Sequence, residues 1–133
     1  MARNYFVCSV GDPNDLSNYD DENYKRCREH KCFVLIPTGR EGSIYIIQKG
    51  DILFLKYQKT LVAYGIAVSS LQTDQDISNG DGWDHRIDVA NWNFLKGVSY
   101  YGISGDQIGG TNFDTVKQIT EDFALGRLKD MGA

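Results

Sequence analysis

The residues of this sequence best suited to chemistry are its aromatic side chains. The chain holds 8 tyrosines, 6 phenylalanines and 2 tryptophans among 133 residues, and both tryptophans, Trp83 and Trp92, lie in the stretch GDGWDHRIDVANWN. Flat rings stack on nucleobases with about 1–3 kcal/mol per base, and they also fill protein cores. The two tryptophans are therefore either core residues or walls of an aromatic pocket.

Strand periodicity separates these two tryptophans. The alternation in residues 84–92 predicts a strand, and successive side chains of a strand point to opposite faces. An unbroken strand would give Trp83 the face of Ile87 and would place Trp92 on the other face. The two line one pocket only if the segment bends or if Trp83 belongs to the preceding loop, which two nearby glycines favour. We expect Trp83 to be the stronger pocket candidate and Trp92 to serve mainly in packing.

Metal chemistry has weak support. Cys27, His30 and Cys32 lie close in the chain, with Cys8 as a conceivable fourth ligand, but their spacing is not that of a usual zinc site. Cysteines in apolar strands act as small hydrophobic residues, so we expect core packing. The acidic segment 74–85 lacks the glycine and glutamate that a calcium-binding loop needs at its sixth and twelfth positions.

Catalysis has little support either. The sequence holds only two histidines and no nucleophile elbow of the Gly-x-Ser-x-Gly type. Its glycine-rich stretch GISGDQIGG lacks the Gly-Lys-Ser/Thr ending of a phosphate-binding loop. We therefore expect a binding module without a cofactor, and any enzyme activity would belong to another domain or subunit.

The charge distribution limits the kinds of partner. A formal net charge of −4 argues against a protein that coats nucleic acid by bulk electrostatics. Residues 24–64 are nevertheless locally basic between acidic flanks. Such a segment suits contact with a few phosphates, and scattered solubilising charge explains it equally well.

Hydrophobic periodicity predicts the elements that position these residues. Strands are expected at 5–10, 32–37, 51–57, 61–70 and 84–92, with a further short strand at 43–48. Three residues separate the third and fourth of these, which indicates a hairpin. Helices are expected at about 20–30 and at 111–132; in the second, Thr111 would be the cap and Phe113, Val116, Ile119 and Phe123 the apolar stripe.

These elements predict an α+β fold. We expect a curved, mainly antiparallel sheet of five or six strands, or a small barrel, with helices outside. Residues 1–133 fit one domain, and the sequence is also compatible with its being the N-terminal part of a larger protein. We expect no membrane span, no signal peptide and a cytoplasmic location, and three cysteines suit that compartment.

The order of several short motifs resembles the PUA-like superfamily, specifically its EVE and YTH branches, over a little more than half of the chain. The matching elements are Tyr5-Phe6, Gly50-Asp51, Phe54 with Tyr57, Gly65, Trp83 and Ile87-Asp88-Val89. The later stretch GDQIGGTNFDTVKQI resembles the entry to the closing helix of EVE-like domains. Such domains are found at the N-terminus of Mcr-type modification-dependent restriction systems.

The resemblance implies a reader that flips one methylated base into an aromatic cage. It suggests Trp83 as the principal wall, with Trp92 and Tyr64 as partners and Ser9 and Asp88 at the base edge; Asp88 is equally suited to pairing with Arg86. The candidate phosphate contacts are Lys25, Arg26, Arg28, Arg40, Lys56 and Lys59, with the last two favoured because they flank the hairpin.

Three partner classes remain open. Modified DNA is the leading expectation, and an ATPase or GTPase motor or a nuclease would then act in the same chain or complex. The first alternative is a modified or unpaired base in RNA. The second is a protein- or small-molecule-binding accessory domain, whose binding would not depend on salt as phosphate contacts do.

Overall fold

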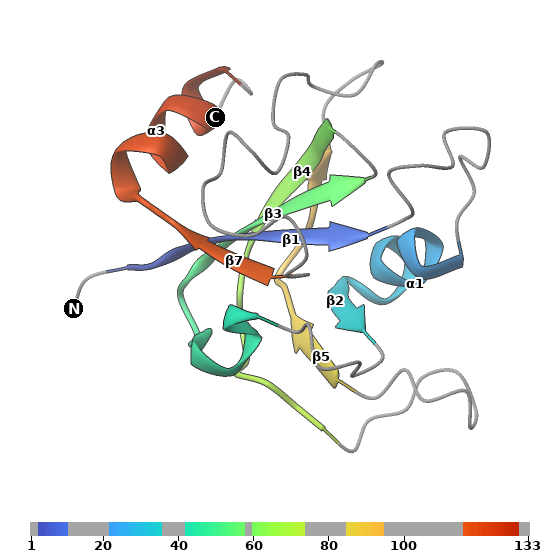
Figure 1. The fold of residues 1–133 in the computed structure, drawn as a ribbon. Coiled ribbons are helices and arrows are strands. Elements are labelled where there is room, and N and C mark those ends of the chain that lie inside the picture. The colour runs from blue at the N-terminus through green and yellow to red at the C-terminus, as the bar shows by residue number, and fades with distance from the viewer. Residues whose placement is uncertain are drawn as a thin grey trace.

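A computed structural model describes residues 3–10, 22–35, 42–57, 60–73, 85–94 and 116–130, and the structural statements below concern these ranges. The chain forms a five-stranded sheet of order β6-β4-β3-β1-β7 and a two-stranded sheet of β2 and β5 (Figure 1). The elements are β1 (Tyr5–Val10), α1 (Glu22–His30), β2 (Cys32–Leu35), the 3-10 helix η1 (Ser43–Ile46), β3 (Ile52–Tyr57), β4 (Thr60–Ile66), β5 (His85–Asp88), β6 (Asn93–Phe94), β7 (Val116–Ile119) and α3 (Glu121–Asp130).

The α+β class and the hairpin of β3 and β4 are confirmed. The larger sheet is mixed, because β1 pairs with β3 in parallel and with β7 antiparallel. Figure 1 shows α3 at one side of this sheet and α1, with β2 and β5, at the other. Among the described residues, no helix has both the length and the apolar character needed to cross a bilayer.

The five-stranded sheet is buried on both faces. Alternation along β1 sends Phe6 and Cys8 into a large cluster with β2 and β5, while Tyr5 and Val7 enter a smaller cluster beneath α3. Since successive side chains of a strand point to opposite faces, the sheet separates these two clusters. We call the side of the large cluster the β5 side and the side of the small cluster the α3 side.

Residues 43–48 do not form the expected short strand. They begin with the 3-10 helix η1, in which Ile44 and Ile47 are buried while Tyr45 and Ile46 are exposed. A 3-10 helix has three residues per turn, so residues three apart share a face. The apolar run therefore had a period of three, and reading it as a strand was wrong.

Within the segment 111–132, which the sequence predicts as one helix, the structure has a strand followed by a shorter helix. Thr111 and Phe113 lie outside the described residues, Val116–Ile119 form strand β7, and the helix begins only at Glu121. Thr120 caps it, since its Oγ1 accepts the backbone N–H of Phe123 at 3.2 Å. Val116 and Ile119 contact the two opposite clusters, and their spacing of three is equally that of a helix. Pairing with β1 decides between the two structures.

The Gly50-Asp51 motif links separate segments of the backbone through hydrogen bonds to the Asp51 carboxylate. Asp51 is 4% exposed, and its carboxylate accepts the backbone N–H of Asn4 at 3.0 Å and that of Gln48 at 2.8 Å. Gly50 has a φ of 99°, which a residue with a side chain rarely adopts. The motif therefore ties η1 and the N-terminal segment to the start of β3.

Candidate nucleic-acid interface

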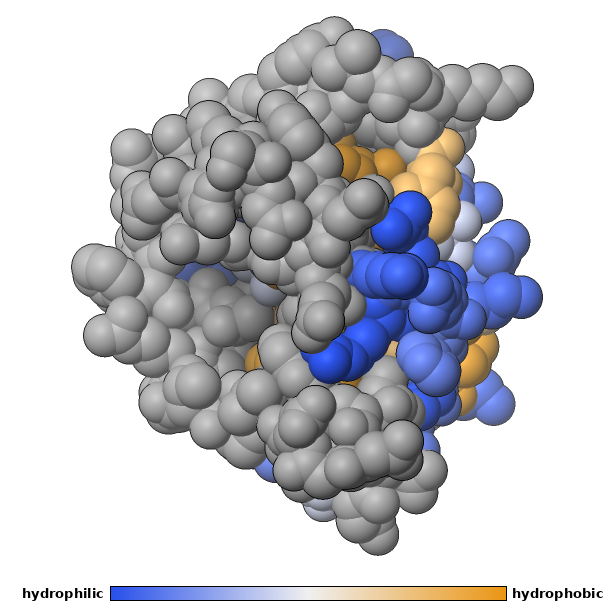
Figure 2. All heavy atoms as spheres, turned by 90° about the vertical axis from the view of Figure 1, so that its right-hand side faces the viewer, coloured by the Kyte–Doolittle hydropathy of each residue, from blue (hydrophilic) through white to orange (hydrophobic). Residues whose placement is uncertain are grey.

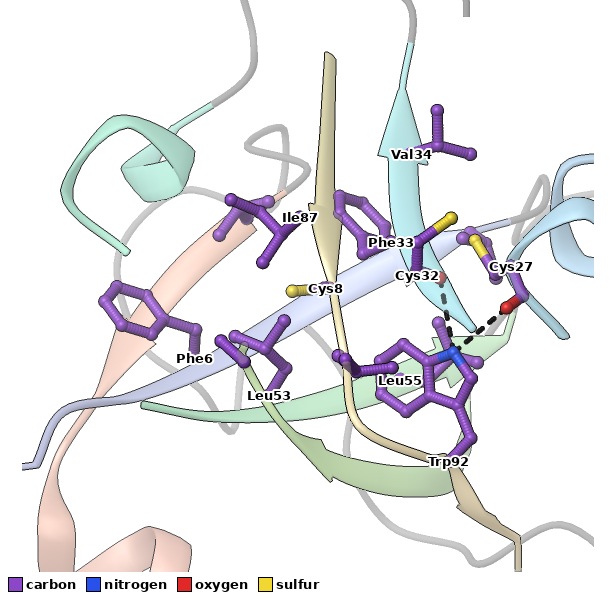
Figure 3. Close-up of a cluster of buried hydrophobic side chains, with 14 of the residues drawn as sticks. Phe6, Cys8, Cys27, Cys32, Phe33, Val34, Leu53, Leu55, Ile87 and Trp92 are labelled. Carbon is purple, nitrogen blue, oxygen red and sulfur yellow. Dashed lines mark hydrogen bonds between the residues drawn. The ribbon is translucent and has the colours of Figure 1, made fainter. Parts of the chain in front are cut away.

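Trp92 is a core residue. It is 5% exposed, and its indole Nε1 donates to the carbonyl oxygens of Cys27 at 3.1 Å and Cys32 at 3.2 Å (Figure 3). A base that stacks on a ring needs an open face, and this ring has none. Burial and two hydrogen bonds assign Trp92 to packing, as the sequence favoured, and do not fit the alternative role of cage wall.

The route by which Trp92 reaches the core differs from the expected one. The regular strand ends at Asp88, and the chain bends at Ala90, whose N–H donates to the carbonyl of Ile66 at 3.0 Å. Trp92 therefore joins Ile87 in the large cluster, although an unbroken strand would have separated them. The expectation that Trp92 faces away from Ile87 was wrong, because the strand does not continue to Trp92.

Trp92 approaches β4 at a glycine. A Cβ built on Gly65 would lie 2.9 Å from the Asn91 carbonyl oxygen and 3.2 Å from Trp92 Cε3. Separations this short require a shift of the backbone or of the indole ring. The glycine within this strand is thus explained by close packing.

Asp88 forms hydrogen bonds with three residues on the β5 side. Its Oδ1 accepts Arg86 Nε at 2.9 Å and Nη2 at 2.6 Å, and its Oδ2 accepts Gln72 Nε2 at 2.8 Å. Its backbone N–H donates to Ser69 Oγ at 3.0 Å. Both carboxylate oxygens are therefore engaged within the protein, which is the structural alternative that the sequence left open for Asp88.

Ser9 and Tyr64 lie on the other side of the sheet from Trp92. Tyr64 packs against the small cluster on the α3 side. Ser9 is in register with Lys56 and follows the alternation that places Val7 on that side. A single pocket therefore cannot contain Ser9 and Tyr64 together with Trp92 and Asp88, because the sheet stands between the two pairs.

The principal candidate, Trp83, lies outside the described residues, two positions before β5. At this end of the two-stranded sheet His85 pairs with Leu35, the last residue of β2. The ring of His85 meets that of Tyr45 edge-to-face, with centroids 6.3 Å apart and planes at 89°.

Helix α1 is attached to the opposite end of β5. Lys31, with a φ of 51°, ends the helical segment, and its carbonyl accepts the N–H of Val89 at 2.9 Å. The Trp92 indole N–H donates to the carbonyl oxygens of Cys27 in α1 and Cys32 in β2. These contacts fix the orientation of α1 relative to β5.

The exposed charges of this segment are mainly basic. Lys25, Arg28 and Lys31 are exposed beside Glu29, while Arg26 is half-buried. Figure 2, viewed from the α1 side, shows hydrophilic side chains gathered over the described part of this face. Of the remaining predicted cations, Arg40 and Lys59 lie outside the described residues.

Lys56 has a different environment. It is 9% exposed on the α3 side of the sheet, and burial together with the neighbouring charge of Lys117 lowers its pKa. Lys117 is brought there by β7, where it is in register with Val7. Sequence reasoning missed Lys117 because it assigned that segment to a helix.

The three cysteines are buried, as expected, and none of them forms a disulfide. Burial raises the pKa of Cys8 well above its ordinary value and that of Cys32 to about 11. These are the properties of packed thiols and not of reactive thiolates. Within the described ranges, no three His, Cys, Asp or Glu side chains form a group that could hold a metal ion.

Comparison with solved structures identifies the fold. The YTH domain of Pho92, solved in complex with N6-methyladenosine, matches with a TM-score of 0.60 at 15% identity, covering 98% of this chain and 84% of that one. The YTH domain of Zygosaccharomyces rouxii MRB1, in complex with N6-methyladenosine RNA, gives 0.59 at 14% identity, covering 97% and 86%. The YTH domain-containing protein mmi1, solved with RNA, gives 0.55 at 13%, covering 98% and 87%.

No family model and no curated protein sequence matches the chain. Two of these solved complexes contain RNA, and none of the comparisons supports the expected preference for DNA or the expected link to a restriction system. The structural matches cover 97–98% of the chain, whereas the sequence motifs covered a little more than half of it. This protein has the fold of the YTH domains.

Proposed function

We propose that this domain binds single-stranded RNA and recognises a methylated base, with N6-methyladenosine as the first candidate. The observation that carries the proposal is the fold shared, over nearly the whole chain, with one domain solved in complex with N6-methyladenosine RNA and another solved with N6-methyladenosine. The proposed activity is binding, without a catalytic step in this domain.

Trp83 is the proposed wall of the base pocket. In the sequence it precedes His85, the first residue of β5, by two positions. Stacking of a flipped base on its indole would contribute about 1–3 kcal/mol, which offsets a similar cost of unstacking that base. Trp92 offers no alternative, because its ring is enclosed in the core.

Helix α1 is the proposed source of phosphate contacts. Lys25 and Arg28 are exposed, Arg26 is half-buried, and the helix is fixed to β5 through the Val89 and Trp92 hydrogen bonds. Arg40, Lys56 and Lys59 remain predicted contacts. Each phosphate neutralised on a single strand adds about 0.7 to the slope of log affinity against log salt.

Fluorescence anisotropy with short labelled oligonucleotides tests the function. A single-stranded RNA with one central N6-methyladenosine should bind about fourfold or more tightly than its unmodified twin, since burial of one methyl contributes about 0.8 kcal/mol. Equal affinities would refute recognition of this modification. A DNA strand of the same sequence with the same methylated base is the third ligand, and tighter binding to it would restore the DNA hypothesis.

Two variants test the pocket. Trp83→Ala should weaken binding of the methylated RNA roughly 5- to 100-fold and abolish the preference over the unmodified RNA. Phe94→Ala is the matched control, because Phe94 is 41% exposed at the edge of the larger sheet. If the preference survives in Trp83→Ala, the pocket lies elsewhere. Affinity that does not change with salt would favour an accessory domain for protein or small molecules.

A further inference from the structure

Tyr45 is the most exposed of the large apolar and aromatic side chains in the described residues, at 59%. Its position in the fold is nevertheless fixed. The residues on either side of the Tyr45-Ile46 pair, Ile44 and Ile47, are buried at 0% and 1%. The N–H of Ile47 donates to the Ile44 carbonyl at 3.4 Å, and that of Gln48 to Asp51 Oδ2 at 2.8 Å. A rigid turn therefore holds an exposed ring in place.

The contact with His85 also sets the direction of this ring. The two rings are perpendicular, with centroids 6.3 Å apart. A perpendicular neighbour covers an edge or one face of a ring and leaves the rest of the ring open. Tyr45 thus presents a flat, oriented surface to solvent, and the residue that orients it lies two positions from Trp83.

We propose that Tyr45 is a stacking platform for the nucleobase adjacent to the modified base on the bound strand. This inference rests on the proposed function and extends it from one base to two. When a base is flipped into a pocket, its neighbour loses a stacking partner on that side. An aromatic ring beside the pocket replaces that partner for any base, because every base has a flat π face.

The rigidity of η1 favours this role. A side chain that is already ordered loses little conformational entropy on binding, so more of the stacking free energy appears as affinity. The platform would read no sequence, because stacking alone does not distinguish the hydrogen-bonding edges of bases. It would instead favour single-stranded over double-stranded RNA, because the bases of a single strand are not held in a duplex and can stack on the ring.

The test is a double-mutant cycle between the protein and the RNA. The ligands are one N6-methyladenosine RNA and two derivatives in which the 5′ or the 3′ neighbour of the modified nucleotide is abasic, each also made without the methyl group. The proteins are wild type, Tyr45→Ala and Tyr45→Phe, with dissociation constants from anisotropy. Far-UV circular dichroism and thermal unfolding confirm folding, and removal of so exposed a side chain should change stability little.

We expect one abasic substitution to weaken wild-type binding roughly 5- to 100-fold. Tyr45→Ala should weaken binding of the intact RNA by a similar factor and cause no further loss with that abasic RNA, while Tyr45→Phe should bind like wild type. Losses that multiply, or intact binding by Tyr45→Ala, would overturn the platform.

The outcomes also separate the platform from the proposed function. A preference for methylated RNA with no effect of Tyr45 would refute the platform alone. A non-additive cycle without any preference for the methyl group would refute recognition of the modification and leave the platform standing. Absence of RNA binding by the wild type would refute both.

Discussion

The two ends of β5 differ more than their sequences suggest. Beyond the C-terminal end, Trp92 is enclosed, its indole N–H donates to two carbonyls, and both oxygens of the preceding Asp88 carboxylate accept hydrogen bonds. At the N-terminal end, His85 pairs with the last residue of β2 and meets a tyrosine that is 59% exposed. Similar residue types therefore serve packing at one end and remain available for a ligand at the other.

The two ends differ in the exposure of their ring faces and not in their aromatic content. A ring whose faces and polar atom are all in contact with protein contributes to stability. A ring with one fixed edge and an open surface is available to stack with a ligand. Substitutions at the two ends should therefore affect different measurements: stability at the C-terminal end and binding at the N-terminal end.

The largest effect is expected at Trp92. Trp92→Ala should lower the free energy of unfolding by about 3–5 kcal/mol, since it opens a cavity and leaves two carbonyls without their donor. Urea denaturation checks this, with Trp92→Phe as the variant that keeps most of the packing and loses the hydrogen bonds. A small change in Trp92→Ala would mean that this end of β5 is not the closed region described here.

The next effect is expected at the glycine beneath Trp92. Gly65→Ala should destabilise by about 1–3 kcal/mol, because its Cβ would lie 2.9 Å from the Asn91 carbonyl oxygen. Gly126→Ala is the matched control in α3, where a Cβ would meet nothing within 4 Å. That change should stabilise by roughly 0.5–1 kcal/mol, since alanine favours a helix over glycine. Thermal unfolding of both variants measures the contrast, and equal shifts would contradict it.

A smaller effect is expected at Asp88. Asp88→Asn should weaken the pair with Arg86 and destabilise the protein by about 0.2–1 kcal/mol, because the pair is partly exposed. Affinity for the methylated RNA should stay within twofold of wild type if Asp88 is only a structural residue. A large loss of affinity with unchanged stability would return Asp88 to the base edge.

The smallest effect on stability is expected at Lys56. Burial and the charge of Lys117 lower the pKa of Lys56 below 10.5, so the unfolded state binds more protons between the folded and unfolded pKa values. Stability contributed by this group therefore rises with pH through that alkaline window and is least below the folded pKa. Lys56→Met should remove this dependence and raise the urea midpoint at pH 7.

The same Lys56 variant examines the predicted phosphate contact. If Lys56 meets a phosphate, the slope of log affinity against log salt should fall by about 0.7 in Lys56→Met. Lys49→Met is the control, because Lys49 is exposed and belongs to no predicted contact. An unchanged slope would remove Lys56 from the interface.

Local pattern was sufficient for several elements. The runs that became β1, β2, β3 and β4 are continuous apolar segments bounded by turn residues, and α1 has the charge order of a short helix. The burial of the cysteines and the hairpin of β3 and β4 were also predicted from the sequence. The site residues Trp83, Arg40 and Lys59 lie outside the described residues and stay predictions.

By itself, the sequence determined which segments are apolar and which turns join them, because those properties depend on near neighbours. Only the tertiary structure decided that residues 116–119 form a strand, since a spacing of three fits a helix until β1 supplies hydrogen-bond partners. It also separated Ser9 and Tyr64 from Trp92, because the side of a sheet that a residue faces depends on register and on where strands end. Those are contacts between distant segments, and no local pattern records them.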